Sequence, residues 1–119
     1  MPEIITAKIL QENLKKYLEN TFGDMVKFVV DIEKGIAAIG GEMHADCEEI
    51  LLQNYSRQEN LWGANLYPFK SGEERIEYTS LINIRPSAEN RGMEIHDEVI
   101  KGKVREIAER LLFAPGAHL

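Results

Sequence analysis

The segment MVKFVVDIEKGIAAIGG, residues 25–41, constrains the fold most strongly, because it has the pattern of a β-hairpin. Apolar, mostly β-branched residues alternate along its first half, as suits a pleated strand with one buried face. Glu33-Lys34-Gly35 follows as a short turn in which Gly35 can adopt a positive φ, typical of a three-residue loop with a bulge. This register places Ile32 opposite Ile36. The small residues of the second strand leave room for a helix to lie close against it.

Helical patterns flank this hairpin. From Thr6 to Phe22 apolar residues recur at helical spacing, and Gly23 stands where a left-handed cap is expected. After the hairpin, Asp46 is followed by Glu49 three residues later, a spacing that predicts an N-cap with its capping-box partner. The sequence therefore predicts one helix before the hairpin and a second helix directly after it.

A second hairpin is predicted between residues 60 and 86. NLWGANLYPF and RIEYTSLINIRP are its two strands, and Lys70-Ser71-Gly72-Glu73-Glu74 is the loop between them. In the second strand, alternation predicts a core face made of Ile76, Tyr78, Ile82 and Ile84. The opposite, outward face comprises Glu77, Thr79, Leu81, Asn83 and Arg85. Pro86 ends this strand, since proline cannot donate to a ladder.

The last helix begins near its expected N-cap Asp97 and ends at Ala114-Pro115-Gly116. Its inward stripe comprises Ile100, Val104, Ile107, Ala108 and Leu111. Gly102 interrupts this helix and costs about 1 kcal/mol relative to alanine. The helix is nevertheless the best interpretation of the segment.

The predicted order is αββαββα in a single domain spanning residues 1–119. Two hairpins most simply form one four-stranded, mainly antiparallel sheet with helices on one face, which is the α+β class. The other face is wet or is buried against a second copy of the chain. If Val29, Leu61 and Leu81 lie on that face, they form an apolar patch larger than monomers usually expose. We therefore expect a homodimer or another homo-oligomer.

Composition narrows the classes of partner. The chain has 119 residues, of which 44% are hydrophobic, enough for one core. Its 20 acidic and 14 basic residues give a net charge of -6, which disfavours binding to nucleic acid or to anionic membranes. No apolar run is long enough for a membrane span, and the N-terminus lacks a signal-peptide pattern. We expect a soluble cytoplasmic protein.

The chain has one cysteine, Cys47, so no disulfide can form within it. A position in the first turn of a helix would lower the pKa of a thiol, but the neighbouring acidic side chains Asp46, Glu48 and Glu49 act in the opposite direction. A buried, unreactive cysteine is the preferred interpretation.

Three segments resemble the signature of a small prokaryotic family of uncharacterised proteins, known only as a domain of unknown function. They are FVVDIEKGIAAIGGEMHADCEEILLQ, SRQENLWGANLYP and SLINIRPSAENR, which together cover roughly Phe22 to Arg91. The resemblance implies a small single-domain protein with no assigned activity. It also implies no catalytic residues that could be transferred to this chain.

Glu42, His44 and Asp46 are candidate metal ligands, because in an extended chain alternate residues point to the same side. Two carboxylates and an imidazole could hold a divalent metal. No second histidine lies nearby in sequence, and Asp46 already has a role as N-cap. The alternative is a solvated connection between strand and helix, and no cofactor is otherwise implied.

A second candidate set combines arginine and asparagine side chains. Arg85, Asn83 and Asn65 are expected to project outward from the second hairpin, with Arg91 and Asn90 in the following loop. The guanidinium fork fits carboxylate or phosphate, so the set could bind a small anion or an acidic peptide. The alternative is that the arginines pair with internal carboxylates such as Glu42, Asp46 or Glu94.

The aromatic residues Trp62, Tyr67 and Phe69 are more typical of a core or an interface than of a ligand-stacking surface. No complete set of nucleophile, base and orienting group is visible in the sequence. The preferred prediction is a non-enzymatic, oligomeric binding or interaction module, whose ligand would be anionic. The alternative is a metal-dependent hydrolase or lyase that uses Glu42, His44 and Asp46.

Overall fold

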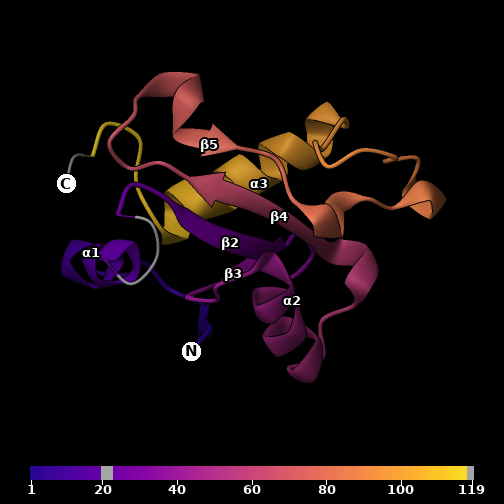
Figure 1. Ribbon diagram of the computed structural model, residues 1–119, viewed down its shortest axis with the longest axis horizontal. Helices are drawn as coiled ribbons and strands as arrows, with labels where there is room; N and C mark the ends of the chain where they lie inside the picture. The colour runs from indigo at the N-terminus through magenta and orange to yellow at the C-terminus, as the bar shows by residue number, and fades with distance from the viewer. Residues whose placement is uncertain (20–22, 118–119) are drawn as a thin grey trace.

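Five antiparallel strands form the sheet, one more than the sequence predicts. The computed structural model describes residues 1–19 and 23–117. The strands lie side by side in the order β1 (Glu3–Ile5), β3 (Ile36–Ile39), β2 (Val26–Asp31), β4 (Leu61–Leu66) and β5 (Ile76–Glu77) (Figure 1). Every neighbouring pair is antiparallel. The α+β class is confirmed, whereas the predicted four-stranded sheet and the exact element order are not.

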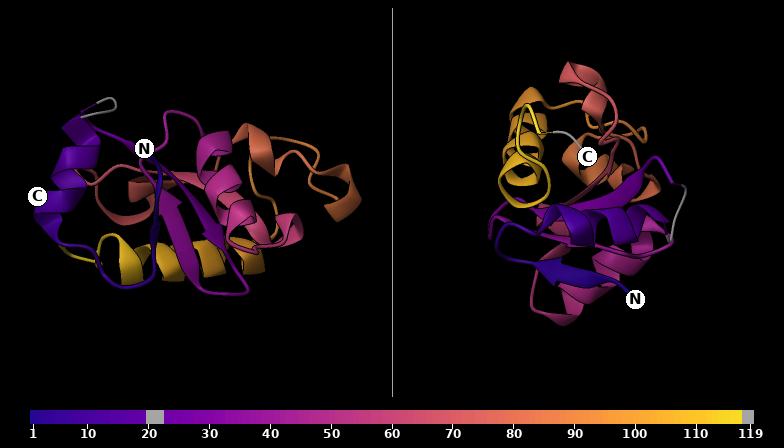
Figure 2. Two further views of the ribbon diagram at one scale, coloured as in Figure 1. Left: turned by 90° about the horizontal axis from the view of Figure 1, so that it is seen from below. Right: turned by 90° about the vertical axis from the view of Figure 1, so that its left-hand side faces the viewer.

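Helices cover both faces of this sheet. α1 (Gln11–Glu19) and α3 (Glu98–Leu111) pack on one face, and α2 (His44–Gln53) packs on the other. Figure 2 shows α2 and α3 on opposite sides of the strands. The prediction that all helices share one face is therefore wrong. β2 is apolar on both sides, with Phe28 toward one core and Val29 toward the other, so each face needs a cover.

The core is accordingly divided into two clusters. The larger cluster lies against α1 and α3 and includes Trp62, only 2% exposed, whereas Phe69 of the same predicted aromatic set is 63% exposed. The smaller cluster lies beneath α2 and contains Val29 and Leu61, both fully buried. Of the predicted apolar surface patch only Leu81 is exposed, at 65%. That patch is absent because α2 covers the positions that should have formed it.

The first hairpin differs from its prediction by one residue of register. Asp31 pairs with Ile36, whereas the sequence predicted Ile32 opposite Ile36. The buried Asp31 carboxylate accepts hydrogen bonds of 2.9 Å from each of the backbone amides at positions 33 and 34. This side-chain cap directs a four-residue turn over residues 32–35. Gly35 ends the turn with φ +69°, the positive value that was predicted.

The N-terminal segment contains both a strand and a shorter helix. α1 begins at Gln11 rather than at Thr6, and its predicted end at Phe22 lies outside the described residues. Upstream of it, β1 pairs with β3 and places Ile4 opposite Ala38. Three residues are too few for an alternating pattern to stand out, which is why the sequence does not reveal this strand.

The second hairpin is confirmed only in its first half. β5 ends at Glu77, and residues 79–96 form an irregular segment, here called the arm, which projects beyond the sheet (Figures 1 and 2). Its short helical turns are η3 (Leu81–Asn83) and η4 (Pro86–Ala88). The predicted alternation is wrong here: Ile84 is 44% exposed, while Asn83 is fully buried.

The Asn83 side chain explains why the strand does not continue. Its Oδ1 accepts a hydrogen bond from the Gly63 amide at 2.8 Å, and its Nδ2 donates to the Gly63 carbonyl at 2.9 Å. A side-chain amide thus takes the place of a backbone strand partner beside β4. A Cβ on Gly63 would come within 2.7 Å of Ser80 Cβ, so glycine is required for this close approach.

α3 begins as predicted. The Asp97 carboxylate accepts hydrogen bonds from Val99 N at 2.8 Å and Ile100 N at 3.3 Å, and so acts as the N-cap. The helix buries the stripe Val104, Ile107, Ala108 and Leu111. None of the described helices has the length and apolar composition needed to cross a bilayer.

Candidate ligand-binding groove

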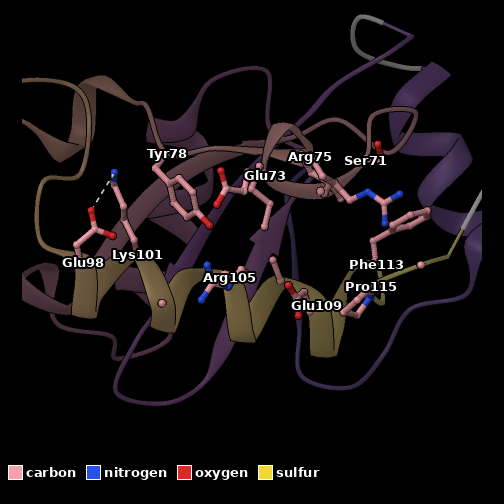
Figure 3. Close-up of a pocket in the computed structure, with 16 residues that line it drawn as sticks. Ser71, Glu73, Arg75, Tyr78, Glu98, Lys101, Arg105, Glu109, Phe113 and Pro115 are labelled. Carbon is pink, nitrogen blue, oxygen red and sulfur yellow. Dashed lines mark ion pairs between the residues drawn. The ribbon is translucent and has the colours of Figure 1, made fainter.

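A groove of about 660 Å³ lies between α3 and the segment that leads into β5 (Figure 3). One wall comes from the helical turn η2 (Gly72–Arg75) and from β5, the other from one face of α3, and the end from the C-terminal turn. Four apolar side chains, each at most 9% exposed, contribute to its lining: Leu66, Ile76, Ala108 and Phe113. This volume suits a small organic ligand.

Arg75 holds one end of the groove together. Its Nε donates to the Lys70 carbonyl at 2.9 Å, and its terminal nitrogens donate to the Ala114 carbonyl at 3.4 Å and the Ala117 carbonyl at 3.2 Å. The guanidinium also lies 4.7 Å from the centre of the Phe113 ring, a favourable cation–π distance. The charge of Arg75 thus fixes the η2 loop to the turn that follows α3.

Lys101 marks the opposite end. Its Nζ lies 3.3 Å from a Glu94 oxygen and 3.8 Å from a Glu98 oxygen, and 5.7 Å from the centre of the Tyr78 ring. The ammonium group is therefore already surrounded by two carboxylates and an aromatic face. It closes the groove on the side of the arm.

Between these ends, Tyr78 and Glu73 extend from the upper wall toward α3, which carries Arg105 and Glu109 (Figure 3). Burial raises the pKa of the Tyr78 phenol, and the negative charges of Glu109 and Glu73 raise it further, while Arg105 acts in the opposite direction. The phenol therefore stays protonated at neutral pH and can donate a hydrogen bond. Within the described chain, no carboxylate lies at ion-pair distance from the Arg105 guanidinium.

Gly102 makes the α3 wall shallow beside Lys101. A Cβ built on it would meet no atom within 4 Å, so packing inside the protein does not require glycine here. The α3 face that borders the groove combines this bare backbone with Lys101, directly before it, and with Arg105 and Glu109, which follow it at helical spacing. A ligand could lie directly against the helix at this point.

The predicted metal ligands do not converge. His44 Nε2 donates to the Ala64 carbonyl at 2.8 Å, and burial lowers the pKa of the imidazole. Asp46 Oδ2 accepts from the Met43 amide at 3.1 Å, whereas the Glu42 side chain is exposed. In residues 1–19 and 23–117, no group of three or more His, Cys, Asp or Glu side chains could hold a metal ion.

Asp46 was also predicted to be the N-cap of the second helix, and this is wrong. The helix begins at His44, Met43 is the N-cap, and Asp46 is the third residue of the first turn. Its carboxylate caps the helix from inside, in the position that the prediction gave to Glu49. Because α2 begins three residues earlier than predicted, His44 lies in its first turn, and the ring reaches the Ala64 carbonyl of β4.

Arg85 binds backbone carbonyls and not the carboxylates proposed as its alternative partners. Its Nη2 donates to the carbonyls of Leu61 at 2.8 Å and Ile82 at 3.2 Å, and the guanidinium lies 4.5 Å from the centre of the Trp62 ring. Burial lowers the pKa of Arg85, while the nearby Glu48 carboxylate acts in the opposite direction. The group therefore fixes the arm onto the sheet.

The asparagines of the same predicted set are also engaged. Asn83 holds Gly63, and Asn90 Nδ2 lies 2.8 Å from the Asn83 carbonyl, which it supports. Asn65 Nδ2 donates to a Glu77 carboxylate oxygen at 2.8 Å. Arg91 is exposed on the arm. The structure therefore does not bring these side chains together around one cavity.

Cys47 is fully buried on the inner face of α2, as predicted. Burial raises the pKa of its thiol to about 11, and the Asp46 carboxylate contributes in the same direction. The thiol is therefore protonated at neutral pH and has no opening to solvent through which to react.

The groove itself was not predicted from the sequence. Tyr78 and Arg105 come from segments 27 positions apart, and their alternation and helical patterns are satisfied equally by a core role or a surface role. The one usable signal was Gly102, a glycine inside an otherwise regular helix. Such a residue costs stability and therefore often marks a close approach by another group.

One family model matches the chain over residues 3–111, and that family is described as "Protein of unknown function (DUF5674)". No curated protein and no solved structure shows significant similarity to the chain. Any functional conclusion has to come from the residues of the groove.

Proposed function

The chain belongs to this family of unknown function, as its sequence segments predicted, and we propose that it binds a small amphipathic ligand in the groove beside α3. The apolar part of the ligand would rest on the buried floor, and an anionic group would meet Arg105 and Tyr78. The observation that carries this proposal is the Arg105 guanidinium, which faces a 660 Å³ groove without a carboxylate partner among the described residues.

The chemistry of the lining supports a ligand that is apolar on one side. Leu66, Ile76 and Phe113 form an apolar floor, and each Å² of the ligand's own apolar surface that this floor covers is worth about 25 cal/mol. A guanidinium donates two parallel hydrogen bonds to a carboxylate or sulfonate, and the Tyr78 hydroxyl adds a third donor. A few convergent polar groups above an apolar floor are typical of small-molecule sites.

The anionic ligand predicted from the sequence is thus kept in this proposal, but at Arg105 instead of Arg85, Arg91, Asn83 and Asn65. A homo-oligomeric state and a cytoplasmic location remain predictions. The metal-dependent hydrolase gains no support from the arrangement of Glu42, His44 and Asp46, whose side chains serve separate local contacts.

The proposal is tested by fluorescence titration of the folded protein with 8-anilinonaphthalene-1-sulfonate, a planar aromatic anion. We expect saturable binding of one probe molecule per chain. Gly102→Leu, which fills the open space of the groove beside Lys101 and Arg105, should abolish the signal. Arg105→Gln should weaken binding about 10-fold, because a charged hydrogen-bond partner is lost.

The matched control is Lys103→Gln, which removes a positive charge from an exposed position on α3 that does not border the groove. This variant should bind the probe as the parent does. Circular dichroism of each variant establishes that the fold is intact. Absence of binding to the folded parent, or equal binding by the parent and Gly102→Leu, would overturn the proposal.

A further inference from the structure

The charges around the groove define the ligand more narrowly, and we propose that it is a zwitterion of the amino-acid type with an apolar side chain. Its carboxylate would bind Arg105, and its ammonium group would bind Glu73 and Glu109. This inference rests on the proposed ligand-binding function of the same groove. It adds an ammonium group to the proposed anionic ligand and so specifies the ligand's chemical class.

The charges in the lining of the groove are balanced in number. Six charged side chains border the groove, three positive and three negative: Arg75, Lys101, Arg105, Glu73, Glu98 and Glu109. Lys101 is within 4.0 Å of Glu98 and also pairs with Glu94. Arg75 is engaged by backbone carbonyls at the end wall. Arg105, Glu73 and Glu109 are left to determine what the middle of the groove can hold.

Glu73 and Glu109 are close neighbours of the anion site. Both carboxylates raise the pKa of Tyr78, whereas Arg105 lowers it, and all four side chains line the same groove. Neither carboxylate has a cationic side chain at ion-pair distance within the part of the chain that the structure describes. Figure 3 shows the Glu73 carboxylate beside Tyr78, on the wall opposite the α3 residues.

A ligand that carries only a negative charge would meet these two carboxylates as well as Arg105. The repulsion would offset part of the attraction, since groove walls screen charges less than open water does. A ligand that carries only a positive charge would meet Arg105 in the same way. A ligand with a carboxylate and an ammonium group a few ångströms apart can pair with the positive and the negative side chains of the groove at once. None of these side chains then faces a like charge on the ligand.

The open space beside Gly102 and the apolar floor of the groove indicate where the apolar side chain of the ligand would lie. Gly102 leaves open space against the helix next to Lys101 and Arg105, and Phe113 lies at the far end of the floor. A large apolar side chain can occupy this floor while the charged groups remain near Tyr78. The volume of about 660 Å³ is ample for a free amino acid of this kind.

The test uses isothermal titration calorimetry with three probes that share one aromatic ring. L-phenylalanine carries both charges, 3-phenylpropionate lacks the ammonium group, and 2-phenylethylamine lacks the carboxylate. We expect L-phenylalanine to bind at least about 10-fold more tightly than either of the others, because each deletion leaves a charged group of the groove without its partner.

Each variant should weaken the binding of one probe and strengthen the binding of another. Glu73→Gln and Glu109→Gln should weaken binding of L-phenylalanine about 10-fold and strengthen binding of 3-phenylpropionate. Arg105→Gln should weaken L-phenylalanine and strengthen 2-phenylethylamine. The controls are Glu106→Gln and Lys103→Gln, which change exposed charges of α3 outside the groove and should change no affinity.

A change of sign between probes cannot come from partial unfolding, which would weaken all three. Equal affinity for L-phenylalanine and 3-phenylpropionate, or an unchanged affinity of L-phenylalanine in both glutamine variants, would overturn the inference. So would a failure of all three probes to bind. If 8-anilinonaphthalene-1-sulfonate still binds in the groove, any of these results leaves the proposed function standing.

Discussion

The side-chain amide of Asn83 binds both the N–H and the C=O of Gly63, and so completes the edge of β4 where β5 has ended. A third hydrogen bond runs from Asn83 Nδ2 to the Met93 carbonyl at 3.1 Å and fixes the far side of the arm. Asn83 is fully buried, and so are its two hydrogen bonds to Gly63, whereas Met93 is 42% exposed. Asn83 therefore joins β4 to both sides of the arm, in addition to the contacts that Arg85 makes with Leu61 and Trp62.

We expect Asn83→Ala to lower the free energy of unfolding by about 2–3 kcal/mol, because the buried backbone N–H and C=O of Gly63 lose their partner and the hydrogen bond to the Met93 carbonyl is lost as well. Asn83→Asp should cost more, since a carboxylate cannot donate and brings a buried charge. Chemical denaturation measures both values. Gln53→Ala, at an exposed position of α2, is the control and should change stability by less than about 0.5 kcal/mol. Equal effects of the Asn83 and Gln53 variants would contradict the role given to Asn83.

Gly102→Ala should stabilise the protein by about 0.5–1 kcal/mol, because alanine is the better helix former and its Cβ meets no atom within 4 Å. Thermal denaturation would register this as a rise in Tm of a few degrees. Gly72→Ala is a matched control, since Gly72 also borders the groove with nothing within 4 Å but has φ +60°. That variant should lower the Tm. A loss of stability in Gly102→Ala would show that the helix needs this glycine for its own packing.

The Cys47 thiol should resist modification in the folded protein. Its pKa of about 11 leaves roughly 0.1% thiolate at pH 8, and the side chain is fully buried. We expect 5,5′-dithiobis(2-nitrobenzoate) to react at least about 100-fold more slowly than after denaturation. Stability should also fall as the pH rises from about 9 toward 11, because the unfolded thiol loses its proton first. Rapid labelling of the native protein at pH 8 would contradict this assignment.

His44 should make the protein sensitive to mild acid. Burial lowers the pKa of its imidazole in the folded state, with Lys27 acting in the same direction and Glu77 in the opposite one. Below the ordinary value of 6.5 the unfolded chain binds a proton that the folded chain does not, so stability is lost as the pH falls. Denaturation midpoints measured between pH 7 and 5 should fall less steeply in His44→Asn than in the parent.

The control for this pH dependence is His96→Gln, which removes an exposed histidine from the arm. Its midpoints should follow the pH profile of the parent. A parent profile that is flat between pH 7 and 5, or one that His44→Asn leaves unchanged, would contradict the proposed linkage.

Sequence patterns predicted those elements whose residues determine their own conformation. Gly35 required a turn, Asp97 capped α3, and the alternation around Phe28 and Trp62 identified buried faces. The patterns failed where a distant partner decides the conformation. Alternation from Ile76 to Ile84 predicted a strand, but Asn83 turns inward to Gly63, and the chain leaves the ladder.

The same reason explains what was missed at the site. Nothing in the local sequence shows which of Arg85 and Arg105 is available to a ligand. In the structure the Arg85 guanidinium donates to backbone carbonyls, whereas Arg105 borders the groove. The start of α2 was predicted three residues too late, with Asp46 as the N-cap instead of Met43. Only the contacts in the folded chain reveal which of the two residues stands at the N-cap position. Contacts between segments far apart in the chain cannot be read from local spacing.

The shortness of β5 limits how this protein can associate with itself. A long bare strand at a sheet margin would recruit other chains in register, but here the margin beyond β4 has two ladder residues and is then completed by an asparagine side chain. Fibre-like growth of the sheet is blocked on that flank. The opposite margin is β1, a strand of three residues, so each edge of the described sheet offers only a short ladder to a second copy.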